Sequence, residues 1–338
     1  MPPQYIILFI TTCISLLYFS WGINSWKFSL VGDEWAFYSF AKETAEKNFL
    51  VNPFDFKGVY LQNSVLVSYY QAIFLKILGY SNFAWRISNI ILIIPITLFF
   101  FFWIKKSFNS RIALISTVIL QSSFYLANFF KIGNIMPQAL MLFILCLYTA
   151  YSCGVSPSTK KFIFLGFLLG VSFYVYIGPL FPLLIWPYLL SLINRKHLNP
   201  SLFINIFLLI ISYVLVLLPT FLNINDWNGP AGKTVFHKEY EGYSQTVINV
   251  FRNFLLFYKN YDYLYNHFVA GPYLDLVSRI LGLIGTIIVI INVRKKEYLF
   301  LLLTYISTCV IIGLTSPYWY APTTRGIFFC PLVLLLQV

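Results

Sequence analysis

The chain alternates between long apolar runs and polar connectors that carry glycine or proline. Ten runs approach the roughly 20 apolar residues that a helix needs to cross a bilayer. They lie at about 5–22, 83–104, 111–129, 135–152, 162–178, 180–194, 201–221, 273–293, 298–314 and 326–338. This pattern predicts an all-α, polytopic membrane helix bundle of about ten spans, with one membrane domain over residues 1–338. Only Gly178-Pro179 separates the fifth and sixth runs, which predicts either a tight hairpin or a kink in one long helix.

Two connectors are long, residues 23–82 and 223–272, and connectors of this length are usually functional. After Gly32 the first of them predicts a short interfacial helix, because apolar and charged positions fall on two different arcs. The apolar arc holds Phe37, Phe40, Ala41 and Thr44, and the charged arc holds Lys42, Glu43, Glu46 and Lys47. We therefore expect the chemistry on the side of the membrane to which both long connectors belong.

Composition narrows the class of protein. Hydrophobic residues make up 59% of the chain and charged residues 10%, whereas soluble domains carry about 25% charged residues. An ordinary water-soluble enzyme is therefore excluded. The cysteines at 13, 146, 153, 309 and 330 form no close pair, which argues against a disulfide framework or a zinc site. The first run follows no basic residue and precedes no small-residue cleavage site, so we expect an uncleaved first span.

The chain has a net charge of +12. The distribution of its basic residues among the connectors predicts the orientation of the spans. With the N-terminus in the cytoplasm, the inner connectors hold ten basic residues and one acid, and the outer segments hold thirteen basic residues and ten acids. Basic residues concentrate on the cytoplasmic side of membrane proteins. The pattern thus predicts a multi-pass plasma (inner) membrane protein with both long connectors outside. The basic excess reports topology and does not indicate a nucleic-acid partner.

Asp33 and Glu34 are the leading candidates for chemistry, because they stand at the start of the interfacial helix beside the first span. One interpretation makes Asp33 an N-cap and lets Glu34 complement the helix dipole. The other makes them a base or metal ligands at the membrane surface. No acid falls in the middle of a span, which disfavours an ion-coupled transporter. No nucleotide-binding glycine motif is present, which disfavours a nucleotide-sugar donor.

The order of several motifs resembles the GT-C membrane glycosyltransferases, closest to the protein O-mannosyltransferase and lipid A aminoarabinose transferase group (glycosyltransferase family 39-like). The motifs are Gly32-Asp33-Glu34-Trp35-Ala36, Leu75-Lys76-Ile77-Leu78-Gly79 before Ala84-Trp85-Arg86, Gly170-Val171-Ser172-Phe173-Tyr174-Val175-Tyr176, Asn253-Phe254-Leu255-Leu256-Phe257 with Gly271-Pro272-Tyr273-Leu274-Asp275, and Ala321-Pro322-Thr323-Thr324-Arg325-Gly326. Each motif is short, but their order extends over nearly the whole chain. The resemblance therefore implies a GT-C helix bundle with outer-face interfacial helices.

The same resemblance implies an inverting sugar transfer at the outer face from a donor carried on polyprenyl phosphate. It makes Asp33 the general base, and Glu34 its partner that orients the acceptor or binds a metal. No cofactor is certain, and a divalent metal is an open expectation with Asp33 and Glu34 as its ligands. The expected partners are membrane lipids, the lipid-linked sugar and a glycan, lipid or protein acceptor.

Further candidates surround this pair on the outer side. Cationic side chains must hold the departing phosphate, and the candidates are Arg325, Arg86, Lys57 and Lys131. Aromatic and histidine candidates for the sugar and acceptor are Tyr174, Tyr176, His267 and Tyr320. Each has a simpler interpretation as well: snorkelling for the two arginines, an interface anchor for Lys131, an aromatic belt for the tyrosines and an ordinary surface position for His267.

Departures from the family pattern keep other functions open. The stretch after Gly58 lacks the proline and basic residue that relatives often carry, and Lys131-Ile132-Gly133-Asn134 stands where an acid is common. The chain ends at Val338 within an apolar run, so we expect a truncation or a missing C-terminal region. The alternative functions are a flippase or polymerase of envelope lipids or polysaccharides, and a non-catalytic scaffold of a glycan-assembly complex.

Overall fold

The computed structural model describes residues 2–24, 34–53, 65–176, 180–192, 200–223, 243–254, 257–258, 273–314, 325–328 and 330–338. Helices joined by turns make up these parts of the chain. They are α1 (Pro3–Ser20), α2 (Glu34–Glu46), α3 (Val65–Leu78), α4 (Asn82–Ile90), α5 (Ile93–Ser107), α6 (Ser110–Gln121), α7 (Phe124–Phe130), α8 (Met136–Val155), α9 (Thr159–Phe173), α10 (Leu180–Leu192), α11 (Pro200–Asn223), α13 (Tyr243–Phe254), α14 (Leu276–Ile291), α15 (Lys296–Leu314), the 3-10 helix η4 (Arg325–Phe328) and α16 (Cys330–Leu335). The predicted all-α membrane bundle is confirmed.

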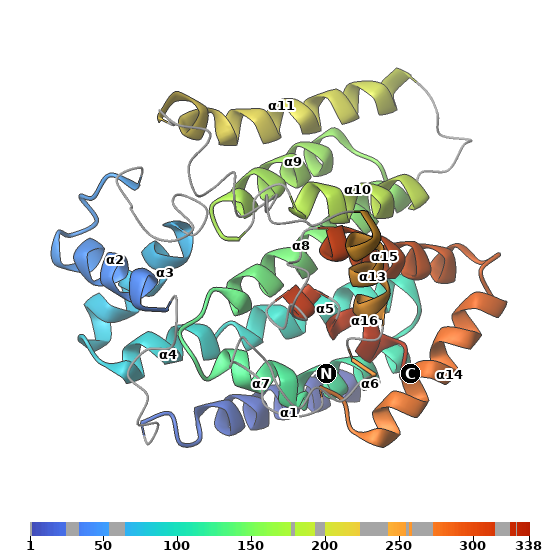
Figure 1. The fold of residues 1–338 in the computed structure, drawn as a ribbon, viewed down its shortest axis with the longest axis horizontal. Helices are drawn as coiled ribbons and strands as arrows, with labels where there is room; N and C mark the ends of the chain where they lie inside the picture. The colour runs from blue at the N-terminus through green and yellow to red at the C-terminus, as the bar shows by residue number, and fades with distance from the viewer. Residues whose placement is uncertain are drawn as a thin grey trace.

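Helices α5, α6 and α8 form the middle of the bundle, where α5 packs against both of the others (Figure 1). Helix α1 covers α6 and α5 on one side, and α10 packs between α8 and α15 on the other. Helix α9 lies on α8 and carries α11 as an outer layer, drawn at the top of Figure 1. Since α9 and α10 are separate helices that both pack on α8, the apolar stretch around them is not one continuous helix.

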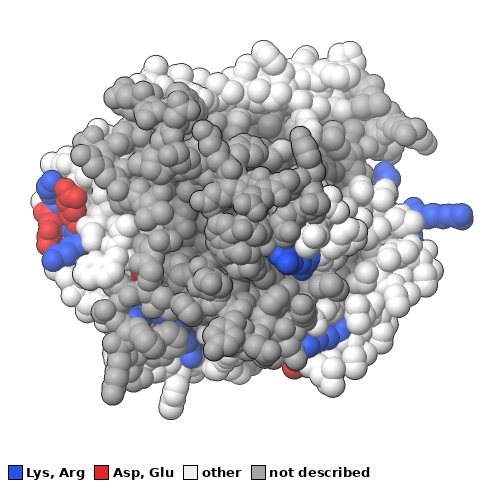
Figure 2. Space-filling view, viewed as in Figure 1, with Lys and Arg blue, Asp and Glu red and all other residues white. Residues whose placement is uncertain are grey.

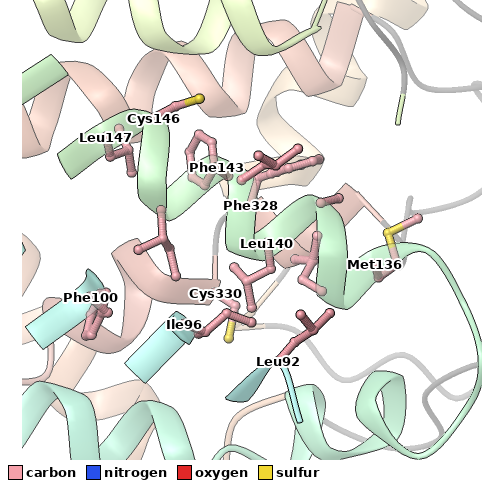
Figure 3. Packing of buried hydrophobic residues seen from close by; sticks show 14 of the residues in the cluster. Leu92, Ile96, Phe100, Met136, Leu140, Phe143, Cys146, Leu147, Phe328 and Cys330 are labelled. Carbon is pink, nitrogen blue, oxygen red and sulfur yellow. The ribbon is translucent and has the colours of Figure 1, made fainter. Parts of the chain in front are cut away.

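Large apolar side chains from distant parts of the chain fill this middle layer. Figure 3 shows Phe100 of α5, Phe143 of α8 and Phe328 of η4 within one packed group. The Phe143 and Phe328 rings lie 5.2 Å apart, edge to face. Cys330 of α16 is buried in the same group. The C-terminal helices thus complete a core that the helices of the first half begin.

The described residues include five helices long and apolar enough to cross a membrane. They are Pro3–Ser20, Asn82–Ser107, Met136–Val155, Pro200–Leu222 and Lys296–Gly313, and the pair α6–α7, bent by 58°, makes a sixth if it counts as one span. Other predicted spans contain helices that are shorter, among them α9, α10, α14 and α16. About ten spans were predicted, and five or six helices of the described residues reach spanning length.

The helix ends assigned to the cytoplasmic side lie together. Lys105 at the end of α5 donates to the Tyr5 hydroxyl at the start of α1, at 2.8 Å. Lys106 donates to Tyr148 near the end of α8, also at 2.8 Å. The sequence predicts that successive helices cross the membrane in alternating directions. These contacts agree with that prediction, because they join helix ends that were assigned to the same side of the membrane. Which side is cytoplasmic stays a prediction.

The helix ends assigned to the outer side meet in the same way. Arg86 of α4 contacts the backbone after α1, where it donates to the Ile23 carbonyl at 3.1 Å. The Leu66 amide at the start of α3 donates to the Tyr174 carbonyl at the end of α9, at 3.0 Å. Helices α2, α3 and α4 pack on one another at this end of the bundle, at the left of Figure 1.

Helix α2 is the predicted interfacial helix, and its two arcs are confirmed. The apolar arc is buried, whereas the charged arc forms an exposed patch over α2 in Figure 2. Lys47 donates to Glu43 at 2.6 Å, and Lys42 lies 3.7 Å from Glu46. The hydrogen bond and charge of Glu43 raise the pKa of Lys47 above its ordinary value. The helix therefore presents one face to the protein and the other to water.

Candidate functional site

Several predicted site residues lie outside the part of the chain that the structure describes. They are Asp33, Lys57, His267 and Tyr320. For Arg325 the structure describes only its place as the first residue of η4. The geometry of the site is therefore built from Glu34, Arg86, Lys131, Tyr174 and Tyr176, and from the residues that contact them.

Glu34 is fully buried at the first turn of α2. Its Oε1 atom accepts a hydrogen bond from the indole Nε1 of Trp85 at 2.7 Å and from the backbone amide of Gly133 at 2.6 Å. These donors are 51 and 99 residues away in sequence. The carboxylate thus joins α2 to α4 and to the turn between α7 and α8. Both of these contacts are N–H donors, and they hold this oxygen as a hydrogen-bonded anchor.

The turn at 131–134 is held through its backbone on several sides. Asn89 of α4 donates to the carbonyls of Ile132 and Asn134, at 2.7 Å each. Gln71 of α3 donates to the Gly133 carbonyl at 3.3 Å. Three helices of the outer end therefore bind a single turn. We call Glu34, Gln71, Trp85, Asn89 and residues 131–134 the Gly133 cluster.

Gly133 has to be glycine because the Trp85 ring lies against it. A Cβ atom built on Gly133 would lie 1.6 Å from Trp85 Nε1 and 2.3 Å from two other atoms of the ring. The Tyr38 ring also contacts Trp85, edge to face, with 5.3 Å between centroids. The indole is fully buried. Its orientation is thus fixed by packing as well as by its hydrogen bond to Glu34.

Arg86 follows Trp85 on α4 and is also fully buried. Its guanidinium donates to the Ile23 carbonyl at 3.1 Å. We predicted Arg86 as a phosphate ligand or a snorkelling interface residue. The structure places its side chain in the interior, beside the chain that leaves α1, and its role toward phosphate stays a prediction.

Lys131 ends α7 at the edge of the Gly133 cluster. Its ammonium lies 5.0 Å from the centre of the Tyr18 ring near the end of α1, a cation–π distance. The side chain is partly exposed, in contrast to Arg86. This position is compatible with both predicted roles, an interface anchor and a ligand of an anionic headgroup.

The two predicted sugar-contacting tyrosines of the described residues are buried. The Tyr174 hydroxyl donates to the Val216 carbonyl at 2.9 Å and accepts from Thr220 at 2.7 Å, both in α11. The Tyr176 ring packs against Phe328 with 5.9 Å between centroids. The geometry gives Tyr174 a role in joining α9 to α11.

Sequence reasoning missed the contributions of Gln71, Trp85, Asn89 and Gly133. Trp85 and Gly133 stand inside stretches that the motif comparison had quoted, but nothing local marks them as partners of Glu34. Their sequence distances from Glu34 are 51 and 99 residues. In the described residues no three His, Cys, Asp or Glu side chains come together as a metal site.

Comparisons with known proteins can be set beside this geometry. The family model of dolichyl-phosphate-mannose-protein mannosyltransferases matches residues 62–220. ArnT from Cupriavidus metallidurans bound to undecaprenyl phosphate is similar over 100% of this chain and 60% of its own, with 12% identity and a TM-score of 0.69. This chain has the GT-C fold. The fold that the motif resemblance implied is confirmed.

Other structures with the GT-C fold agree. The Archaeoglobus fulgidus oligosaccharyltransferase in its apo form has 14% identity and a TM-score of 0.64, over 99% of this chain and 49% of its own. Archaeal AglB from the same organism, in complex with an inhibitory peptide and a dolichol-phosphate, gives a TM-score of 0.59 at 14% identity, over 99% of this chain and 50% of its own. The chain thus spans about three fifths of ArnT and half of AglB. No curated protein matches it by sequence.

Proposed function

We propose that this GT-C protein is an integral-membrane glycosyltransferase that takes its sugar from a polyprenyl-phosphate donor. The family match at residues 62–220 supports the reaction class. Solved proteins of the same fold hold undecaprenyl phosphate or dolichol-phosphate. The observation that carries the proposal is the anchored start of α2: Glu34 is bound by Trp85 and Gly133, and Asp33 is the residue directly before it.

Asp33 is the proposed general base. An acceptor hydroxyl attacks the anomeric carbon and gives its proton to the Asp33 carboxylate, while the bond from that carbon to the phosphate oxygen breaks. The new glycosidic bond forms on the face opposite the leaving group, so the configuration inverts. Polyprenyl phosphate departs with the bonding electron pair.

Cationic side chains hold the departing phosphate in this proposal. Lys131 is the described candidate, because its ammonium lies at the edge of the Gly133 cluster and is partly exposed. Arg325 and Lys57 keep the same proposed role, and Tyr320 and His267 that of acceptor contacts. Arg86 keeps its proposed role toward phosphate, with a buried guanidinium that donates to the Ile23 carbonyl. With the N-terminus in the cytoplasm, the site faces the outer side of the membrane.

The test is a transfer assay in membranes with radiolabelled undecaprenyl-phosphate mannose and undecaprenyl-phosphate aminoarabinose. Wild type is compared with Asp33→Asn and with Glu43→Gln, an exposed acid of α2 that serves as the matched control. At equal expression, Asp33→Asn should reduce transfer about 100-fold or more, the usual effect of removing a general base. Glu43→Gln should transfer at the wild-type rate.

Two results would contradict the proposal. Transfer that survives Asp33→Asn would show that Asp33 is not the general base. It would favour the simpler interpretation of Asp33 as a helix cap. No transfer by wild type from either donor, combined with labelled lipid that crosses the membrane, would favour the flippase function instead.

A further inference from the structure

We infer that Trp85 is a positioning residue of the proposed transfer, which fixes the start of α2 next to Asp33. This inference rests on the proposed function and deepens it. It starts from two neighbouring residues of α4. Arg86 donates to the Ile23 carbonyl, and Trp85 donates to the Glu34 carboxylate. Ile23 and Glu34 flank the segment that contains Asp33. A single turn of α4 thus binds the chain on both sides of the proposed base.

The support is rigid because α4 belongs to the membrane bundle. Its N-terminus is capped by Ser81, whose hydroxyl accepts from the Ala84 amide at 3.2 Å. Helices α4 and α5 together form the apolar stretch Asn82–Ser107. The contacts of Trp85 and Arg86 therefore tie the flanks of the segment to a helix of spanning length.

Trp85 suits this task because an indole has one N–H donor and no acceptor. That donor points at Glu34 within a fully buried site, where a hydrogen bond to a charged group is strong. Gly133 and Tyr38 lie against the ring and leave it one orientation. Phenylalanine at this position keeps an apolar ring but loses the donor.

The consequence for catalysis follows from the precision that a general base needs. Displacing a reacting group by about 1 Å can cost about 100-fold in rate. Trp85→Phe should therefore lower kcat by about 100-fold at nearly unchanged KM for the donor, since the indole is fully buried and donates to Glu34. Glu34→Gln keeps an oxygen that can accept both hydrogen bonds, so it should retain clearly more activity than Glu34→Leu.

The experiment combines an activity-independent measurement with kinetics on the whole chain in detergent. Hydrogen exchange is followed at the Gly133 amide, which donates to Glu34. Trp85→Phe should exchange there about tenfold faster than wild type, because a hydrogen bond that holds the carboxylate is lost. Trp103→Phe is the matched control: Trp103 is also fully buried but packs against Phe100 and Phe300, away from Glu34.

The kinetics use radiolabelled undecaprenyl-phosphate mannose or aminoarabinose, whichever wild type transfers. Faster Gly133 exchange with a kcat loss confined to Trp85→Phe supports the inference. Unchanged exchange overturns it, and so does unchanged kcat, or Glu34→Gln as inactive as Glu34→Leu. If Trp85→Phe does not fold, the comparison of the two Glu34 variants decides. Transfer that persists in Asp33→Asn overturns the proposed function and the positioning role with it, whereas the exchange data still report whether Trp85 holds Glu34.

Discussion

Replacing Gly133 by alanine tests the contact on which the site depends. The added methyl group would lie 1.6 Å from Trp85 Nε1, far inside the normal contact distance. The clashing atoms belong to a rigid ring and not to the end of a flexible side chain. Trp85 therefore has to move, and its hydrogen bond to Glu34 has to lengthen or break.

The magnitude follows from two contributions. Inserting a methyl group into a well-packed site costs about 1–3 kcal/mol, and losing a hydrogen bond to a charged group costs about 1.5–3 kcal/mol. Because the indole cannot both make room and keep its bond to Glu34, the two add to about 2.5–6 kcal/mol of lost stability. A matched control is Gly79→Ala, which has open space around its Cβ but a φ of +86°. Its cost is the left-handed backbone alone, about 1–2 kcal/mol.

Equilibrium unfolding in mixed micelles can measure these differences through the native cysteines. Cys146, Cys153, Cys309 and Cys330 are free and buried, so a thiol-reactive dye labels them only when the protein opens. The decisive comparison is a double-mutant cycle with Trp85→Leu, which removes the clashing ring.

Gly133→Ala should then cost at least about 2 kcal/mol less in the leucine background than in wild type. Equal costs in the two backgrounds would refute the reasoning, and so would a cost no larger than that of Gly79→Ala.

Two further predictions concern helix packing and capping. Gly166→Ala should destabilise the protein by about 1–3 kcal/mol in the same unfolding assay, because the new Cβ would lie 2.2 Å from the Leu209 carbonyl and push α9 from α11; no loss would mean that the two helices separate freely. Asp275 caps α14 by accepting from the Ser278 amide at 2.9 Å, so Asp275→Ala should cost about 1 kcal/mol. Asp275→Asn, which can still cap, should cost clearly less, and an equal cost would contradict the capping role.

Part of the candidate site was predictable because its signals are local. The apolar and charged arcs of α2 can be read from residue spacing, and they place Asp33 and Glu34 at its start. The predicted fold was also confirmed, because short motifs in a fixed order carry the fold even at 12% identity to ArnT. The catalytic role of Asp33 stays a prediction.

The role of Arg86 was harder to predict. A basic residue at the start of an apolar run is consistent with a phosphate ligand, with snorkelling or with a buried contact, and the three have the same sequence pattern. Burial against Ile23 became visible only when α1 and α4 were placed side by side. The contact of Tyr174 was also not predictable from the sequence, since its hydroxyl binds α11, a later helix of the chain.

The sequence by itself determined that this chain forms apolar helices, where the interfacial helix α2 lies and which helix ends share a side. These properties depend on periodicity and composition, because a bilayer allows a backbone to cross it only with its polar groups paired. Only the tertiary structure decided that Trp85 and Gly133 bind Glu34 and that Arg86 turns inward. The two donors lie 51 and 99 positions from Glu34 in the sequence. Such contacts arise when several helices pack together, so a local sequence pattern cannot predict them.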